Sequence, residues 1–216
     1  AATYTVTTIA NSGAGSLRQA VLDANGVNSN DVIVFNIPAA SCSVAGVCTI
    51  TLASEIIINN NGSLTINGTG ANRLTISGGG VSRIFYSNAA TFTLSGATLT
   101  NGNGAGASFN GKGGAIYASG GTLVLRGVNV IGNMASSGGF GGGVIFDGGA
   151  NHQITNSTFS GNNGLVDCGG FWVGVATPMT MTNTTVSGNT ATQPNGGVLS
   201  GGTMNARKSG FAAMKR

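Results

Sequence analysis

Short runs in which apolar and polar residues alternate recur along most of this chain. Four of these runs close on a Gly-Asn pair, and they align as residues 92–103, 123–133, 152–162 and 179–189. Their final asparagines are 30, 29 and 27 residues apart, and an earlier copy starts at Leu64, 28 residues before Phe92. A repeat of this length, kept over several copies, indicates a solenoid in which each repeat forms one coil.

Within the aligned copies, every second residue is apolar. These positions form two columns, which read Leu94, Leu125, Ile154, Met181 and Leu99, Val130, Phe159, Val186. The neighbouring columns are mostly polar and read Ser95, Arg126, Thr155, Thr182 and Thr98, Asn129, Thr158, Thr185. A period of two is the pattern of a half-buried β-strand, so we expect the apolar columns to face the interior and the polar columns to face solvent.

A second landmark follows each copy. Glycine pairs begin at Gly113, Gly142, Gly169 and Gly196, and each pair leads into a short apolar run. Each coil therefore carries at least two short strands separated by turns. Coils of about 27 to 31 residues with parallel strands predict an all-β protein, a right-handed parallel β-helix.

Asparagines at the repeat ends have a structural interpretation. Asn103, Asn133, Asn162 and Asn189 each follow a glycine. Asparagine tolerates left-handed backbone, and its amide can hydrogen-bond along a stack of identical turns. These four residues are predicted to form an asparagine ladder, although a polar ligand site is an alternative.

The one strong helix signal lies near the start of the chain, over residues 16–26. Ser16 suits the N-cap, Gln19 completes a capping box, and Gly26 suits the end of the helix. Apolar residues form one face of this segment. We expect a short helix that covers the first coil, because an open solenoid end exposes unpaired backbone.

The other end of the chain has no comparable signature. Residues 1–204 are predicted to form a single β-helix domain, and residues 205–216 an irregular basic tail. The uncapped end is a candidate surface for self-association. The chain could also be a fragment of a longer solenoid.

Composition and charge narrow the function classes. Only 6% of the residues are charged, against about 25% in ordinary domains. The net charge is +4, but four of the nine basic residues lie in the last ten positions. The remaining body is neutral, which argues against nucleic acid as the main partner. No apolar run is long enough for a transmembrane helix.

Cysteine placement suggests an oxidising compartment. Cys42 and Cys48 are six residues apart in a short loop, where they could form a disulfide or remain free thiols. Cys168 follows no metal-ligand spacing and is expected to be a small packed residue. No metal site and no cofactor is predicted.

Several motifs carry a family resemblance. Residues 113–116 read Gly-Gly-Ala-Ile, and residues 85–88 and 159–162 read Phe-x-x-Asn. On these motifs the chain resembles secreted bacterial parallel β-helix proteins with polymorphic outer membrane protein-like repeats. Other copies depart from the tetrad, with Gly-Gly-Val-Ile at 142–145 and Gly-Gly-Phe-Trp at 169–172. The resemblance implies export and a passenger-like or cell-surface role, often in adhesion. Its motifs give little information about enzymatic activity.

The sequence offers few candidate catalytic residues. Asp147 and Asp167 could serve a polysaccharide-degrading enzyme, but they are 20 residues apart, less than one coil. His152, the single histidine, occupies an apolar column and has no nucleophile or acid at a suitable spacing. No catalytic residue is assigned.

Two binding surfaces are conceivable. Tyr117, Phe146, Phe171 and Trp172 lie near one another in the repeat and could form an aromatic platform for sugars, or could simply stack along the solenoid. The outward threonine columns could match an ice lattice, although Arg126, Gln153 and Ile131 interrupt them.

The sequence thus predicts a secreted or cell-surface bacterial scaffold that is adhesin-like and without enzymatic activity. Its partner would be a glycan or another component of a host or cell surface. The alternatives are a carbohydrate-binding or polysaccharide-degrading β-helix and, less favoured, an ice-binding protein.

Overall fold

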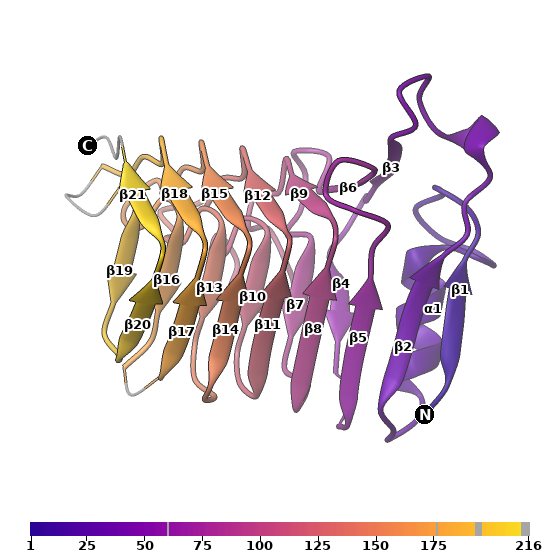
Figure 1. Ribbon diagram of the computed structural model, residues 1–216, viewed down its shortest axis with the longest axis horizontal. Helices are drawn as coiled ribbons and strands as arrows, with labels where there is room; N and C mark the ends of the chain where they lie inside the picture. Colours follow the sequence, from indigo (N-terminus) through magenta and orange to yellow (C-terminus); the bar gives the residue numbers. More distant parts are fainter. Residues whose placement is uncertain (60, 176, 193–195, 213–216) are drawn as a thin grey trace.

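The predicted parallel β-helix is confirmed by the computed structural model, which describes residues 1–59, 61–175, 177–192 and 196–212 (Figure 1). All paired strands are parallel, and successive strands of one sheet come from successive coils. Each strand has only three to five residues, so it depends on the coils on either side for its backbone hydrogen bonds.

Three sheets run along the solenoid axis. The eight-stranded sheet contains β1 (Thr3–Val6), β2 (Asp31–Phe35), β5 (Ser63–Asn67), β8 (Thr91–Ser95), β11 (Thr122–Arg126), β14 (His152–Thr155), β17 (Met179–Thr182) and β20 (Met204–Arg207). The seven-stranded sheet contains β3 (Cys48–Thr51), β6 (Leu74–Ser77), β9 (Thr98–Thr100), β12 (Asn129–Ile131), β15 (Thr158–Ser160), β18 (Thr185–Ser187) and β21 (Gly210–Ala212). The six-stranded sheet contains β4 (Ile56–Ile58), β7 (Phe85–Ser87), β10 (Ile116–Ala118), β13 (Val144–Phe146), β16 (Phe171–Val173) and β19 (Val198–Ser200).

The core is one continuous column of apolar side chains between the three sheets. Both apolar columns predicted from the alternation are fully buried, from Leu94 to Met181 and from Leu99 to Val186. The pairing register places each member opposite the next, as in Leu125 opposite Ile154. Alternation was therefore sufficient to orient these strands.

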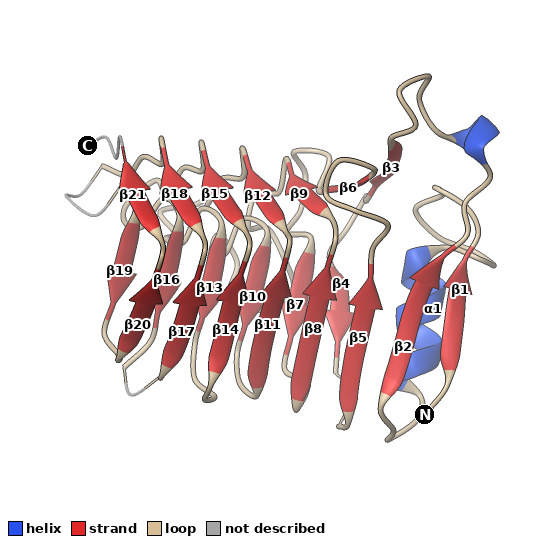
Figure 2. Ribbon diagram, in the orientation of Figure 1, coloured by secondary structure: helices blue, strands red, loops and turns tan. Residues whose placement is uncertain are grey.

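A single α-helix closes the first coil, as Figure 2 shows for the described part of the chain. Helix α1 (Leu17–Asn25) begins at Ser16, whose hydroxyl accepts a hydrogen bond from the Gln19 N–H at 3.1 Å. Its apolar face is buried against β1, β2 and β4. The reciprocal half of the predicted capping box is absent, because the Ser16 N–H donates to the Gly13 carbonyl instead of to the Gln19 side chain.

Side chains of α1 also cover the exposed backbone of β4, the edge strand of the six-stranded sheet. The Arg18 guanidinium donates to the carbonyls of Ser54 and Glu55 at 2.6 and 2.8 Å. The Asn25 amide donates to the Ile57 carbonyl at 2.8 Å. The helix thus satisfies edge groups that another strand would otherwise pair.

The predicted disulfide is present and joins Cys42 to Cys48. It closes a loop that leaves the solenoid between β2 and β3, after a 3₁₀ turn at Ala39–Ser41 (Figure 1). Cys168 is buried, as expected for a packed residue.

The prediction of an irregular tail after residue 204 is wrong for residues 205–212. Strands β20 and β21 continue the solenoid and pair with β17 and β18. Their side chains are mostly small or polar and largely exposed, which hid the repeat in the sequence. Backbone pairing does not require apolar side chains, so the strands form regardless. Residues 213–216 lie outside the described residues.

The asparagine ladder exists, but it has three members and not four. The Asn133 amide donates to the Asn162 side-chain oxygen at 3.1 Å, and the Asn162 amide donates to that of Asn189 at 2.9 Å. All three side chains are buried. Asn103 does not join them, because the register places Gly102 next to Asn133.

The turn after β9 and β12 explains why Gly102, and not Asn103, occupies the ladder position. Asn101 and Gly132 both have left-handed backbone, with φ of 52° and 63°, and both directly follow strands that pair with each other. The residue after each is therefore the ladder position, which is Gly102 in one coil and Asn133 in the next. Asn103 lies one residue further on and donates to the Gly80 carbonyl.

Candidate functional site

The outer faces of the three sheets differ, and this difference defines the candidate site. The outer face of β11, β14, β17 and β20, here called the open face, carries two outward columns. They read Val124, Gln153, Thr180, Asn205 and Arg126, Thr155, Thr182, Arg207. Most of these side chains are polar, and Gln153, Thr180 and both arginines are exposed.

A shallow depression of about 400 Å³ lies on the open face. It is lined by Asn151, Gln153, Thr155, Thr180 and Thr182, all of them neutral and polar. These residues come from β14 and β17 and the turn before β14, so two adjacent coils build the depression. Neutral hydroxyl and amide groups at such a surface can exchange hydrogen bonds with a polyhydroxylated ligand.

The outer face of the six-stranded sheet is largely apolar and is covered over its middle coils, and is here called the covered face. Its outward column contains Ile57, Tyr86, Tyr117, Ile145 and Trp172. The Phe109 ring, from the loop between β9 and β10, stacks on the Tyr117 ring at 4.4 Å. Tyr117 is consequently buried, and Ile145 is buried with Gly141 packed against it, although both point away from the core.

The predicted aromatic platform of Tyr117, Phe146, Phe171 and Trp172 is wrong. Phe146 and Phe171 point into the core and are completely buried, because Ile145 and Trp172 beside them take the outward positions. Tyr117 points outward but lies under Phe109. Of the four residues, only Trp172 remains partly exposed, packed against Phe140.

The loop over the covered face is anchored by a buried ion pair between Arg83 and Glu55. The Arg83 guanidinium contacts the Glu55 carboxylate at 2.7 Å, and the Arg83 side chain is fully buried. It also donates to backbone carbonyls of the loop, those of Gly104, Ser108, Phe109 and Lys112. The second carboxylate oxygen of Glu55 accepts from the Ala107 N–H at 2.6 Å.

The surroundings of Arg83 and Glu55 affect the pKa of Arg83 and require a glycine in the loop beside Glu55. Burial lowers the pKa of Arg83, and the adjacent Glu55 opposes that effect. Gly106 packs directly on Glu55, where an added Cβ would come within 2.4 Å of the carboxylate oxygen. The pair therefore holds the loop, and the loop in turn holds Phe109 over Tyr117.

Asp147, Asp167 and Asp31 each accept a hydrogen bond from a different part of the fold. Asp147 accepts a hydrogen bond from the Tyr117 hydroxyl, whose pKa is raised by burial and by this carboxylate. Asp167 accepts from the Cys168 N–H, and Asp31 from the Ser29 hydroxyl. Glycoside hydrolysis by the usual mechanism needs two carboxylates on opposite sides of one bond, and the described residues do not provide that arrangement.

His152 is buried in the core column, opposite Met179. Its Nδ1 accepts from the Leu123 N–H at 2.9 Å, so the neutral ring carries its proton on Nε2, which lies 2.9 Å from the Gly148 carbonyl. Burial lowers the pKa of the imidazole, opposed by these backbone hydrogen bonds. The sequence had placed His152 in this column, and both ring nitrogens serve the fold.

The described residues contain no group of three or more histidine, cysteine, aspartate or glutamate side chains that could hold a metal ion. They also contain no helix long and apolar enough to span a bilayer.

No family model, no curated protein and no solved structure matches the chain. The resemblance to polymorphic outer membrane protein-like repeats therefore stays an expectation, carried by the motifs alone.

Proposed function

We propose that this chain is a non-enzymatic extracellular or cell-surface scaffold of the adhesin type, which binds its ligand on the open face. The observation that carries the proposal is the depression of neutral polar side chains on β14 and β17, where Gln153 and Thr180 are exposed. Its hydroxyl and amide groups favour a glycan as the ligand.

Two further features support this proposal. The disulfide between Cys42 and Cys48 is typical of proteins that mature in an oxidising compartment, such as the periplasm or the cell exterior. The acids of the described residues are tied to separate structural partners, which favours binding over hydrolysis.

A glycan array combined with a polysaccharide depolymerisation screen tests the proposal. We expect retention on a subset of glycans without release of shortened products. Product release that is abolished by Asp147→Ala or Asp167→Ala would show that the protein is a glycan-degrading enzyme, and would overturn the proposal.

Ice binding is a second candidate, favoured by one observation on the seven-stranded sheet. Its outward positions pair threonine with threonine or serine in five coils: Thr49 and Thr51, Thr75 and Ser77, Thr98 and Thr100, Thr158 and Ser160, Thr185 and Ser187. Of the three interrupting residues, Arg126 and Gln153 lie on the eight-stranded sheet, and only Ile131 falls on this face.

Thermal hysteresis and ice-crystal shape test this second candidate. Thr158→Lys alters the seven-stranded face, and Thr155→Lys is the matched control on the open face. Hysteresis that is lost only in Thr158→Lys would support ice as the ligand. The absence of hysteresis in the unaltered protein would exclude it.

A further inference from the structure

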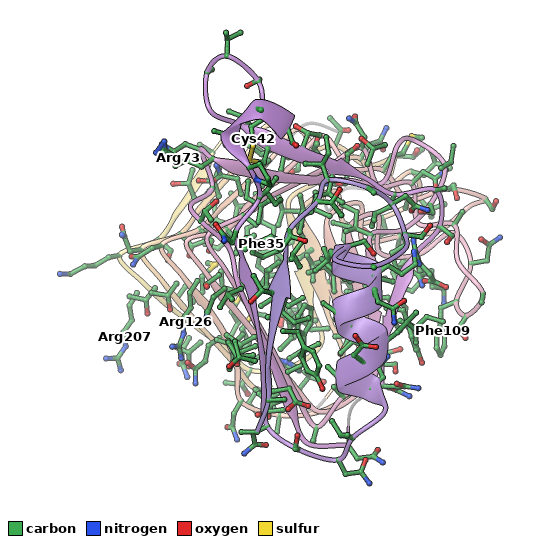
Figure 3. All side chains as sticks on the ribbon, turned by 90° about the vertical axis from the view of Figure 1, so that its right-hand side faces the viewer. Phe35, Cys42, Arg73, Phe109, Arg126 and Arg207 are labelled. Carbon is green, nitrogen blue, oxygen red and sulfur yellow. A yellow bond between two sulfur atoms is a disulfide. The ribbon has the colours of Figure 1, made fainter. Side chains whose placement is uncertain are left out.

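Two arginines border the depression on the open face, one on each side along the solenoid axis. Arg126 ends β11 and Arg207 ends β20, and the register places both in the same outward column as Thr155 and Thr182. Both side chains are exposed and project from the same side of the solenoid (Figure 3). Three inter-strand steps separate them, which is about 14 Å.

Neither arginine is neutralised within the described residues. The single ion pair found there is that of Arg83 with Glu55. Strands β11, β14, β17 and β20 contain no aspartate or glutamate. Lys208, which follows Arg207, is exposed as well. The open face is therefore locally positive, although the body of the protein is neutral overall.

We propose that the open face binds a linear acidic polysaccharide along the solenoid axis, with Arg126 and Arg207 pairing with its carboxylate or sulfate groups. This inference rests on the proposed function and names its ligand class. Guanidinium groups pair with such anions through two parallel hydrogen bonds. Thr155 and Thr182, which lie between the arginines in this column, would bind hydroxyl groups of the intervening sugars, together with Gln153 and Thr180 of the neighbouring outward column.

The density of charge favours a polysaccharide over a nucleic acid. A nucleic acid strand carries one phosphate per ~3.4 Å and is bound by a continuous basic stripe, whereas these four strands carry only two arginines. The open face also has no outward aromatic side chain on these strands on which bases could stack. A membrane surface is disfavoured because these outward columns have no exposed bulky apolar residue.

The test measures binding of polygalacturonate, dextran sulfate and neutral dextran to the full chain at several salt concentrations. Arg126→Ser and Arg207→Thr introduce residue types found elsewhere in the same outward column, at Ser95 and Thr182. We expect each variant to weaken binding of an acidic polysaccharide by about threefold to tenfold, and neutral dextran to be unaffected. Because the separation exceeds the Debye length of about 8 Å, the two losses should multiply in the double variant.

Two control variants separate charge from geometry. Lys112→Gln also removes one positive charge, but from the loop near Phe140 at the covered face, and should leave binding unchanged. Arg126→Lys keeps the charge and loses the paired hydrogen bonds, so it should retain part of the affinity. Polygalacturonate and dextran sulfate distinguish a carboxylate ligand from a sulfate ligand.

Each remaining outcome decides against the inference. Binding to neutral dextran that equals binding to both acidic polymers would overturn it while leaving the proposed function in place. Equal losses in Lys112→Gln and Arg126→Ser would do the same, by showing only a net-charge effect. Stronger binding to single-stranded DNA or to phosphatidylglycerol vesicles would assign the arginines to another partner. No binding to any glycan or polymer would reject both proposals.

Discussion

The covered face and the open face are both built from short parallel strands of successive coils, yet their outward side chains differ. On the covered face, outward positions carry Tyr86, Tyr117 and Trp172, and a loop held by Arg83 lies over the middle of the column. On the open face, the equivalent positions of β14, β17 and β20 carry mainly threonine, glutamine and arginine, and Gln153, Thr180 and Arg207 are exposed. An outward direction is therefore not the same as exposure, because outward Tyr117 is buried beneath the Phe109 ring of an inserted loop.

The largest expected effect comes from removing the anchor of the covered face. Arg83→Met leaves the Glu55 carboxylate buried without a cation and frees the loop carbonyls. Breaking such a pair costs about 3–5 kcal/mol, measured as the free energy of unfolding in denaturant. Arg126→Ser, on the open face, should change the free energy of unfolding by less than about 0.5 kcal/mol. Equal effects of the two substitutions would remove the energetic distinction between the faces.

A smaller loss is expected from the asparagine ladder, which follows the corner between the seven-stranded sheet and the six-stranded sheet. Asn162→Ala leaves several buried backbone and side-chain partners unpaired, among them the Val130 carbonyl. We expect a loss of about 2–3 kcal/mol in the free energy of unfolding. Asn129→Thr is the control, since it introduces the residue of its own column, and a similar loss there would contradict a special role for the ladder.

Beneath the open face, His152 should make stability depend on pH. The folded state keeps the ring neutral and lowers its pKa, whereas the unfolded chain binds a proton below about pH 6.5. Stability contributed by the neutral ring is thus present above pH 6.5 and is lost as the pH falls toward the lowered pKa, by at most about 1.4 kcal/mol per pH unit. His152→Met, which matches Met179, should flatten this part of the curve. An unchanged slope in that variant would assign the dependence to other groups.

The smallest expected change in stability comes from Phe109, the loop residue that covers Tyr117. Phe109→Ala removes the ring that stacks on Tyr117 and is itself partly exposed, so we expect a loss of about 1 kcal/mol. Second-derivative ultraviolet absorbance should report greater exposure of tyrosine. Val81→Ala, at another exposed apolar position, is the control. Unchanged tyrosine exposure in Phe109→Ala would show that the loop does not shield the covered face.

The fold was predictable because alternation and period are local properties of the chain. Leu94 and its column were oriented correctly, and Ser16 correctly marked the start of the helix. The glycine-pair runs are apolar at every position, so alternation could not show that Phe146 and Phe171 face inward while Ile145 and Trp172 face outward. The asparagine ladder was misassigned at Asn103 by one residue, since that register depends on a turn and not on the Gly-Asn pair.

The ion pair of the covered face was missed, although the sequence held a signal for it. Glu55 and Arg83 are 28 residues apart, which is one coil, and Tyr117 and Asp147 are 30 apart. In a solenoid with few charges, groups separated by one period can stack across adjacent coils. Arg126 was placed in its outward column from the sequence, whereas the place of Arg207 in that column was missed because β20 has too few apolar residues to show its register.

Blocking each face in turn is the most direct test of the claim that the open face binds the ligand. Thr180→Trp places a bulky ring in the depression, and Ile57→Trp places the same ring at an exposed outward position on the six-stranded sheet. For the glycan that binds best on the array, we predict at least about a tenfold loss of affinity, more than 1.4 kcal/mol, in Thr180→Trp and no change in Ile57→Trp. A loss confined to Ile57→Trp would contradict the account and place the binding site on the covered face.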